Sequence, residues 1–370
     1  MKQAKQSSIW QRFLKGSFPY TAAAILVGFG VGALALLSAG YDAGIAYGSM
    51  FRVIFSSPKS LSYSFIEYST PYILTGLSVA FSFKTGIFNI GAEGQYIVGS
   101  IAALLVGAFV PLPGWLLVPL CLIAAMAAGA LWAGLVGFLK VRFGSHEVLC
   151  MIMFNWIAYY LNNYIVRLSG INAGGGKTWT VSVLPQAKIG ITGWFPDVTL
   201  SSSAHFGIVL VVLCAVIAWV IISRTTLGFR LKAVGINRNA AEFAGINANG
   251  CVIASLGISG ALAGLAGGLQ VLGVTGKLTQ LAAMESYGFN GITVALIGAC
   301  NPFGTLAAGW FFGAMKFAGT RMVGADNVRV PKEIIDIMMG CIVFMIAASN
   351  LVKVAVVRKL QSKGGKPRHE

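Results

Sequence analysis

Ten apolar segments, separated by charged residues or by short breaks containing Pro or Gly, occupy most of this chain of 370 residues. A helix needs about 20 mostly apolar residues to cross a lipid bilayer. Only 10% of the residues are charged, against about 25% in a soluble domain. We therefore predict an all-α, polytopic membrane protein with about ten transmembrane helices, some of them short or broken. The predicted spans are Tyr20–Gly40, Tyr68–Phe83, Tyr96–Val110, Trp115–Leu139, Glu147–Val166, His205–Ser223, Cys251–Gly273, Phe289–Cys300, Phe303–Ala318 and Ile334–Val352.

The basic residues predict that both termini lie in the cytoplasm. With that orientation most of the 27 Lys and Arg residues fall in inner segments, as the positive-inside rule requires. The predicted organisation is a basic N-terminal segment (1–19), one transmembrane domain (20–352) and a basic tail (353–370). The first apolar run is longer than the core of a usual signal peptide, so we expect an uncleaved helix. We assign the net charge of +16 to loops facing anionic lipid and not to nucleic acid.

Two predicted external segments are long. Tyr41–Glu67 is expected to contain a short helix at Gly48–Phe55 on the membrane surface. Arg167–Ala204 is rich in Gly, Ser and Thr and carries Trp179 and Trp194. It either docks a soluble partner or is a solvated connector.

The stretch Phe83–Gln95 places polar side chains between two apolar runs. Such groups are costly at membrane depth unless they face protein or water. We predict that they line a solute pathway; the alternative is a structural network, for instance Glu93 paired with Lys84. The candidate pathway residues here are Phe88, Asn89, Glu93 and Gln95.

One span carries three amides and an indole. Asn162 and Asn163 follow Asn155 by about two helical turns, so the three share a helix face. Trp156 comes directly after Asn155. We include Asn155, Trp156 and Asn162 in the pathway; hydrogen bonding between helices is the alternative. Asn290 is a further candidate, and Glu285 is expected in a loop at the outer mouth.

The inner segment 224–250 is strongly charged and contains a short helix signal. Asn237 or Asn239 can cap this helix, and Gly235 and Gly245 bracket it. Its small apolar residues would suit docking into a groove on another protein. The alternative is an amphipathic loop lying on lipid.

The sequence lacks the residue patterns of nucleotide-binding, zinc-dependent and hydrolytic enzymes. Gly174–Thr178 resembles a phosphate-binding loop, but Ile171 stands where that motif needs Gly. His146-Glu147 starts like a zinc-protease helix, but Cys150 stands where the second His would be. Only three His residues occur, and the six Cys all lie in apolar runs. We expect neither hydrolytic chemistry nor a metal site.

Three stretches resemble ABC-importer permeases of the ribose, branched-chain amino acid and simple-sugar family, in its simple-sugar/nucleoside branch. These stretches are Phe88–Gln95, Gly257–Gly267 and Gly288–Gly298, and the resemblance covers about Tyr68 to Val352. The segment 224–250 is similar to the family's cytoplasmic coupling loop. The resemblance assigns coupling to Gly235, Asn237, Ala240, Ala241, Glu242 and Gly245.

The resemblance implies a permease subunit that translocates nucleosides or related sugars by alternating access. Partner ATPase subunits would bind ATP and Mg²⁺, so this chain needs no cofactor. A second permease, expected to be a distinct chain, and an extracytoplasmic binding protein would complete an importer of the bacterial cytoplasmic membrane. The alternatives are an ion-coupled secondary carrier using Lys84, Glu93 or Lys316, and a non-transporting membrane scaffold.

Overall fold

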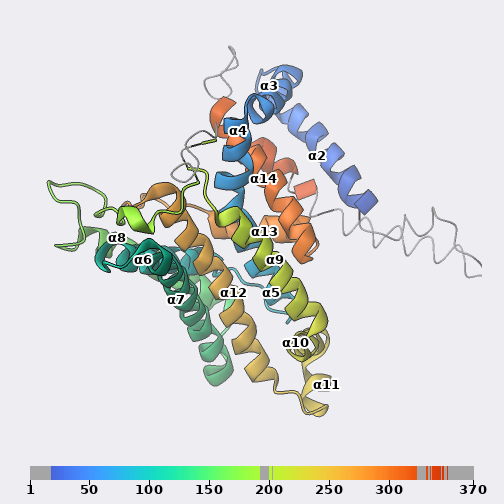
Figure 1. Ribbon diagram of the computed structural model, residues 1–370. Coiled ribbons are helices and arrows are strands. Elements are labelled where there is room, and N and C mark those ends of the chain that lie inside the picture. Colours follow the sequence, from blue (N-terminus) through green and yellow to red (C-terminus); the bar gives the residue numbers. More distant parts are fainter. Residues whose placement is uncertain are drawn as a thin grey trace, which may run out of the picture. The chain divides into compact units, whose positions relative to one another are not determined.

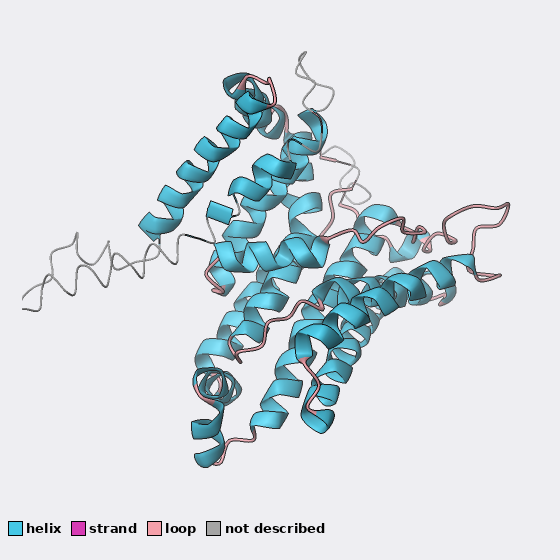
Figure 2. Ribbon diagram, turned by 180° about the vertical axis from the view of Figure 1, so that it is seen from behind, coloured by secondary structure: helices cyan, strands magenta, loops and turns pink. Residues whose placement is uncertain are grey.

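The computed structural model describes residues 18–191, 200–201 and 203–322, and short pieces between 331 and 348 of which 336–342 is the longest. This described part is helical and contains isolated β-bridges but no β-strand, as Figures 1 and 2 show. The basic tail 353–370, most of the N-terminal segment 1–19 and much of the predicted span Ile334–Val352 lie outside the described residues.

The chain divides into two compact units. One comprises residues 1–52 and 319–370. In it, α2 (Phe18–Ser38) and α3 (Ala43–Phe55) meet at a bend of 119°. The Tyr47 hydroxyl donates a 2.7 Å hydrogen bond to the Phe29 carbonyl across this bend. The helix predicted at Gly48–Phe55 is confirmed and begins five residues earlier.

The second unit, Val53–Ala318, contains the remaining helices. They are α4 (Pro58–Ser62), η1 (Tyr63–Tyr68), α5 (Ser69–Phe83), α6 (Ala92–Phe109), α7 (Gly114–Phe143), α8 (Glu147–Arg167), η2 (Pro185–Ala187), α9 (Gly207–Arg224), α10 (Thr226–Ile236), α11 (Arg238–Phe243), α12 (Ala248–Gln270), η3 (Val271–Thr275), α13 (Tyr287–Ile297) and α14 (Pro302–Met322). In Figure 1, α7 and α12 lie side by side, and α10 and α11 lie at the N-terminal end of α12.

Every predicted span from Tyr20–Gly40 to Phe303–Ala318 coincides with a helix. Four helical segments in the described part are long and apolar enough to cross a membrane: Ala92–Phe109, Gly114–Phe143, Gly207–Arg224 and Ala248–Thr275. The bent pair Ala23–Ser38 and Ala43–Phe55 makes five if it counts as one span. The chain is thus multi-pass, while ten spans and the side of each terminus stay predictions. Helix α13 is only 11 residues long.

Glycines let α12 approach α6 and α7 backbone to backbone. A Cβ atom at Gly264 would overlap the Ala125 carbonyl of α7, and one at Gly99 of α6 would overlap Gly264. Likewise a Cβ atom at Gly129 of α7 would overlap the Gly260 carbonyl. Close backbone contact of this kind holds helices together where no hydrophobic force acts between them. At this crossing α6, α7 and α12 pack without intervening side chains at several positions.

This crossing predicts a contrast between two glycines of α12. Gly264→Ala should destabilise the protein by about 1–3 kcal/mol, since neighbouring backbone must move to admit a methyl group. Gly257→Ala is the control, because a Cβ atom there meets nothing within 4 Å and Ala favours helix. We would measure the melting temperature of both variants in detergent. Equal melting temperatures would contradict the packing described.

Candidate functional site

The chain turns back on itself between α5 and α6, and we call residues 84–91 the elbow. Asn89 is fully buried there and pairs with Gln95 through two side-chain hydrogen bonds of 2.9 and 3.1 Å. The side-chain amide nitrogen of Asn89 also donates to the hydroxyls of Ser78 on α5 (3.2 Å) and Ser259 on α12 (2.7 Å). Because Ser78 and Ser259 lie inside their helices, the elbow runs back into the bundle before α6 begins.

Helix α8 holds the elbow from the other side. The Asn155 side chain accepts a hydrogen bond from Gly94 N–H (2.8 Å) and donates one to the Ile90 carbonyl (3.0 Å). Gly94 has no room for a Cβ atom beside Asn155, so glycine is needed for this approach. Phe88 is half-buried at the elbow, in edge contact with Phe83. The elbow is therefore fixed by buried amides.

Glu93 joins the start of α6 to the start of α13. Its two carboxylate oxygens accept hydrogen bonds from the backbone N–H groups of Ser286 (2.8 Å) and Gly288 (2.6 Å), and its side chain is fully buried. The free N–H groups and the dipole of a helix N-terminus favour such a carboxylate. The pairing of Glu93 with Lys84 that we considered from sequence is replaced by this cap.

The other candidate pathway residues lie apart from the elbow. Asn162 is buried and donates to the Thr279 carbonyl (3.0 Å). Trp156 is 47% exposed on α8 and stacks on Tyr160. Asn290 is half-buried in the first turn of α13. Of the predicted set, Trp156, Asn290 and Phe88 present a polar or aromatic group that is at least partly accessible, and the other members are buried.

A small polar cavity lies between α6, α8, η3 and the segment that precedes α13. It measures about 30 Å³. Its polar lining comprises Tyr96, Ser100, Asn162, Gln270, Thr275, Lys277, Thr279 and Glu285. The Tyr96 phenol and the Glu285 carboxylate both belong to this lining and interact electrostatically. Glu285 therefore belongs to this cavity, not only to a mouth loop.

The predicted coupling segment forms two short helices, α10 and α11. Asn237 caps α11 by accepting from Ala240 N–H (3.0 Å), as predicted from sequence. A Cβ atom at Gly235, near the end of α10, would overlap the Lys84 carbonyl. The coupling segment thus touches the elbow turn directly.

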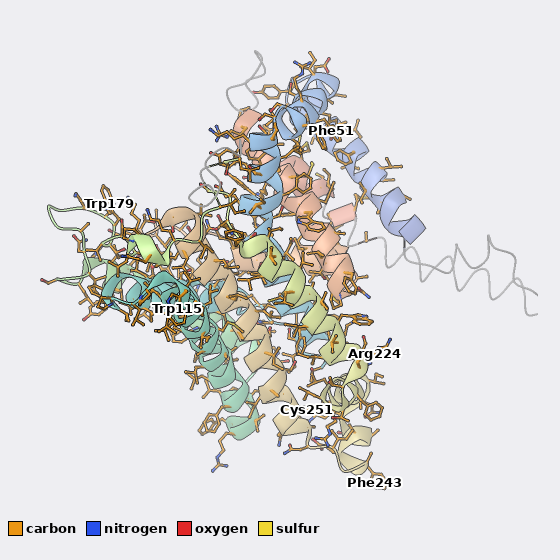
Figure 3. The ribbon with its side chains drawn as sticks, viewed as in Figure 1. Phe51, Trp115, Trp179, Arg224, Phe243 and Cys251 are labelled. Carbon is orange, nitrogen blue, oxygen red and sulfur yellow. The ribbon has the colours of Figure 1, made fainter. Side chains whose placement is uncertain are left out.

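The two faces of α11 differ. Ala241, which we placed on the docking face, is buried against the chain itself, at 4% exposed. Ala240, Glu242 and Gly245 are exposed, and Glu242 pairs with Arg238 (3.1 Å). Phe243 is 97% exposed at the tip of the unit, where Figure 3 shows it projecting.

Sequence reasoning missed several partners of these groups. Ser78 and Ser259 complete the Asn89 network, and Tyr159 reaches the Leu281 carbonyl beside Asn162 (2.9 Å). A hydroxyl within an apolar run is a signal for such a role, but the run does not identify the distant partner. Among the described residues, no three His, Cys, Asp or Glu side chains are grouped to hold a metal ion.

Comparison with known proteins assigns the family. The family described as branched-chain amino acid transport system, permease component, matches residues 62–347. The guanosine ABC transporter permease protein NupP of Bacillus subtilis is 38% identical over 92% of this chain and 96% of its own length. The glucose ABC transporter permease protein TsgB13 of Haloferax volcanii is 30% identical over 89% of this chain and 87% of its own length. NupQ, a second guanosine permease of B. subtilis, is also 30% identical, over 74% of this chain and 85% of its own length.

The matched range includes the elbow, the polar cavity and the coupling segment, so the comparison covers every part of the candidate site. The resemblance inferred from the sequence is confirmed: the chain belongs to the family of branched-chain amino acid transport system permease components, and it is a permease subunit of an ABC transporter.

Proposed function

We propose that this permease imports nucleosides. The observation that carries the proposal is the 38% identity to a guanosine permease along 96% of that protein's length. A related glucose permease is more distant, at 30%, so related sugars are the second candidate. A nucleoside combines sugar hydroxyls with an aromatic base, and the polar cavity and the exposed Trp156 on α8 offer complementary chemistry.

The chain works with ATPase subunits that bind ATP and Mg²⁺ and needs no cofactor of its own. We propose that they dock on α11, where Phe243 offers an exposed aromatic anchor. Aromatic side chains that become buried at an interface carry much of its binding energy. Asn237 and Gly235 position the helix, while Ala240, Glu242 and Gly245 border the docking face; buried Ala241 supports it from within.

A second permease and a binding protein complete the proposed importer. Two different guanosine permeases of B. subtilis resemble this chain, which supports a distinct second permease. The external segment Arg167–Ala204 suits the binding protein, since its described part around Trp179 projects from the helices (Figure 3). We place the assembly in a bacterial cytoplasmic membrane, with lipid around its apolar helices and both termini inside.

Coupling would pass from α11 through Gly235 to the elbow. Closure of the ATPases moves α11, and the backbone contact between Gly235 and Lys84 passes this movement to the Asn89 network. The solute shifts the balance between inward- and outward-open states only through its different affinity for them. In this proposal Trp156, Asn290 and Phe88 contact solute, while Asn89, Glu93, Gln95, Asn155 and Asn162 shape the pathway around it.

The first test is co-purification and uptake. The tagged protein, extracted from native membranes, should bring a second permease and an ATPase carrying Walker motifs. Cells with the intact complex should take up radiolabelled guanosine, and unlabelled nucleosides should compete better than glucose. Uptake of glucose alone would transfer the assignment to sugars. Ion-driven uptake without an ATPase would favour a secondary carrier, and no uptake of any solute would favour a scaffold.

The docking role of Phe243 predicts a second result. Phe243→Ala should weaken binding of the ATPase subunit by about tenfold or more, the effect of losing an aromatic anchor. Phe143→Ala is the matched control, because Phe143 is also an exposed phenylalanine (68%) at the end of a helix, α7. Titration of the ATPase against each purified variant measures the difference. Equal affinities would exclude Phe243 as the anchor.

A further inference from the structure

Residues 276–286 connect η3 to α13, and we call them the gate segment. Backbone of left-handed conformation stands at both ends, at Gly276 (φ 66°) and Ser286 (φ 65°). Glycine adopts this conformation readily, whereas it is uncommon for a residue with a Cβ atom such as Ser286, and such outliers gather at functional sites. The preceding η3 is a π-helix, a form frequent at functional sites. The segment is thus bounded by two irregular joints.

Helix α8 holds the middle of the gate segment. The Asn163 amide donates to the Leu281 carbonyl (2.9 Å) and its oxygen accepts from Leu281 N–H (2.8 Å). One amide thereby satisfies a whole backbone unit, as a paired strand would. Asn162 bonds Thr279 beside it, and Tyr159 also reaches Leu281.

The outer part of the gate segment pairs with the external segment. Gln280 N–H donates to the Thr178 carbonyl (2.7 Å), Thr180 N–H to Leu278 (2.9 Å) and Val183 N–H to Gly276 (2.8 Å). The Lys277 ammonium lies 4.4 Å from the centre of the Trp179 ring. A protein that binds the external segment would therefore pull on the gate segment.

The inner end of the gate segment is fixed by Glu93. Its carboxylate holds Ser286 and Gly288 through their N–H groups. The hydrogen bonds of the middle and outer parts join neutral groups, whereas the Glu93 bonds join a carboxylate to the N–H groups of a helix N-terminus and are stronger. Movement would therefore begin at the latched middle and turn about Ser286.

The gate segment covers the polar cavity. Lys277, Leu278, Thr279, Leu281 and Glu285 belong to its lining, opposite Tyr96, Asn162 and Gln270. At about 30 Å³ the cavity holds about one water molecule, whereas sites for small organic ligands measure about 300 Å³ or more. A carboxylate and two amides would suit hydroxyl and N–H groups of a neutral solute, but the cavity must widen first.

We propose that residues 276–286 form the outer gate of a solute site in this subunit, seen closed, with Asn163 as its latch. The site takes a neutral solute rich in hydroxyl and N–H groups, such as a nucleoside. Docking of the binding protein on the external segment releases the latch. The inference rests on the proposed function, because it assumes that a solute enters from that side.

A reversible lock tests the gate. Cysteines at Asn163 and Leu281, joined by a short bifunctional thiol reagent with a cleavable disulfide, should tie the segment to α8. In the full transporter with its binding protein, the lock should reduce uptake at least tenfold, and reductant should restore it. A control pair at Lys140 and Glu147, which form an ion pair between α7 and α8, receives the same treatment. This control shows whether restraint of α8 alone reduces uptake. It also shows whether reaction of the reagent with the six native cysteines does so.

The outcomes separate the gate from the proposed function. If the locked pair transports as well as the control pair, residues 276–286 are a fixed wall and the gate is excluded. If the unmodified complex with its ATPase and binding protein transports no nucleoside, the proposed function fails before the lock is tested.

Labelling tests the latch without transport. In a variant lacking the native cysteines, Gln270→Cys places a thiol in the cavity lining. Adding Asn163→Ala removes two hydrogen bonds from the closed state and should raise its rate of reaction with a membrane-impermeant maleimide about tenfold. Asn155→Ala is the matched control, since it also removes two backbone hydrogen bonds made by α8, but at the elbow. Equal rates for the two variants would exclude Asn163 as the latch.

Discussion

The hydrogen bonds between Glu93 and the start of α13 determine much of this architecture. A helix that begins inside a bundle has N–H groups without partners, and lipid offers no water to satisfy them. A buried carboxylate, in turn, needs hydrogen-bond donors. Because Ser286 and Gly288 donate to Glu93, α6 and α13 must begin side by side. The elbow before α6 and the segment before α13 are consequently held at one place.

Two different kinds of contact hold the unit Val53–Ala318 together. The crossing of α6, α7 and α12 relies on backbone contact at Gly99, Gly129 and Gly264, which tolerates little displacement because neighbouring atoms already touch. Residues 84–91 and 276–286 are instead held by side-chain amides, each contributing about 1 kcal/mol. A transporter needs a frame and elements that move against it, and these two kinds of contact would suit the two roles.

Local features of the fold were predictable, and distant pairings were not. The apolar runs located the helices, and the side chain of Asn237 capped α11 as expected, since both depend on neighbouring residues. The partner of Glu93 lies nearly 200 residues away, so the sequence suggested the nearer Lys84. Ala241 belonged to a small apolar set, but only packing decides which member turns inward. The number of spans likewise depends on where α13 enters the bundle.

The elbow connects the two surfaces that partners would use. From α11, the contacts run through α10 with its Gly235 to Lys84 in the elbow, which also holds the Asn89 network. From Glu93 they continue to Ser286 and the segment paired with Thr178 and Thr180. Spatial continuity alone does not establish coupling. Linkage adds a stronger requirement. If binding at the outer end changes the affinity of α11 for its partner through the elbow, binding at α11 must change the affinity of the outer end by the same free energy. A permease that uses this route therefore cannot be controlled from one face only.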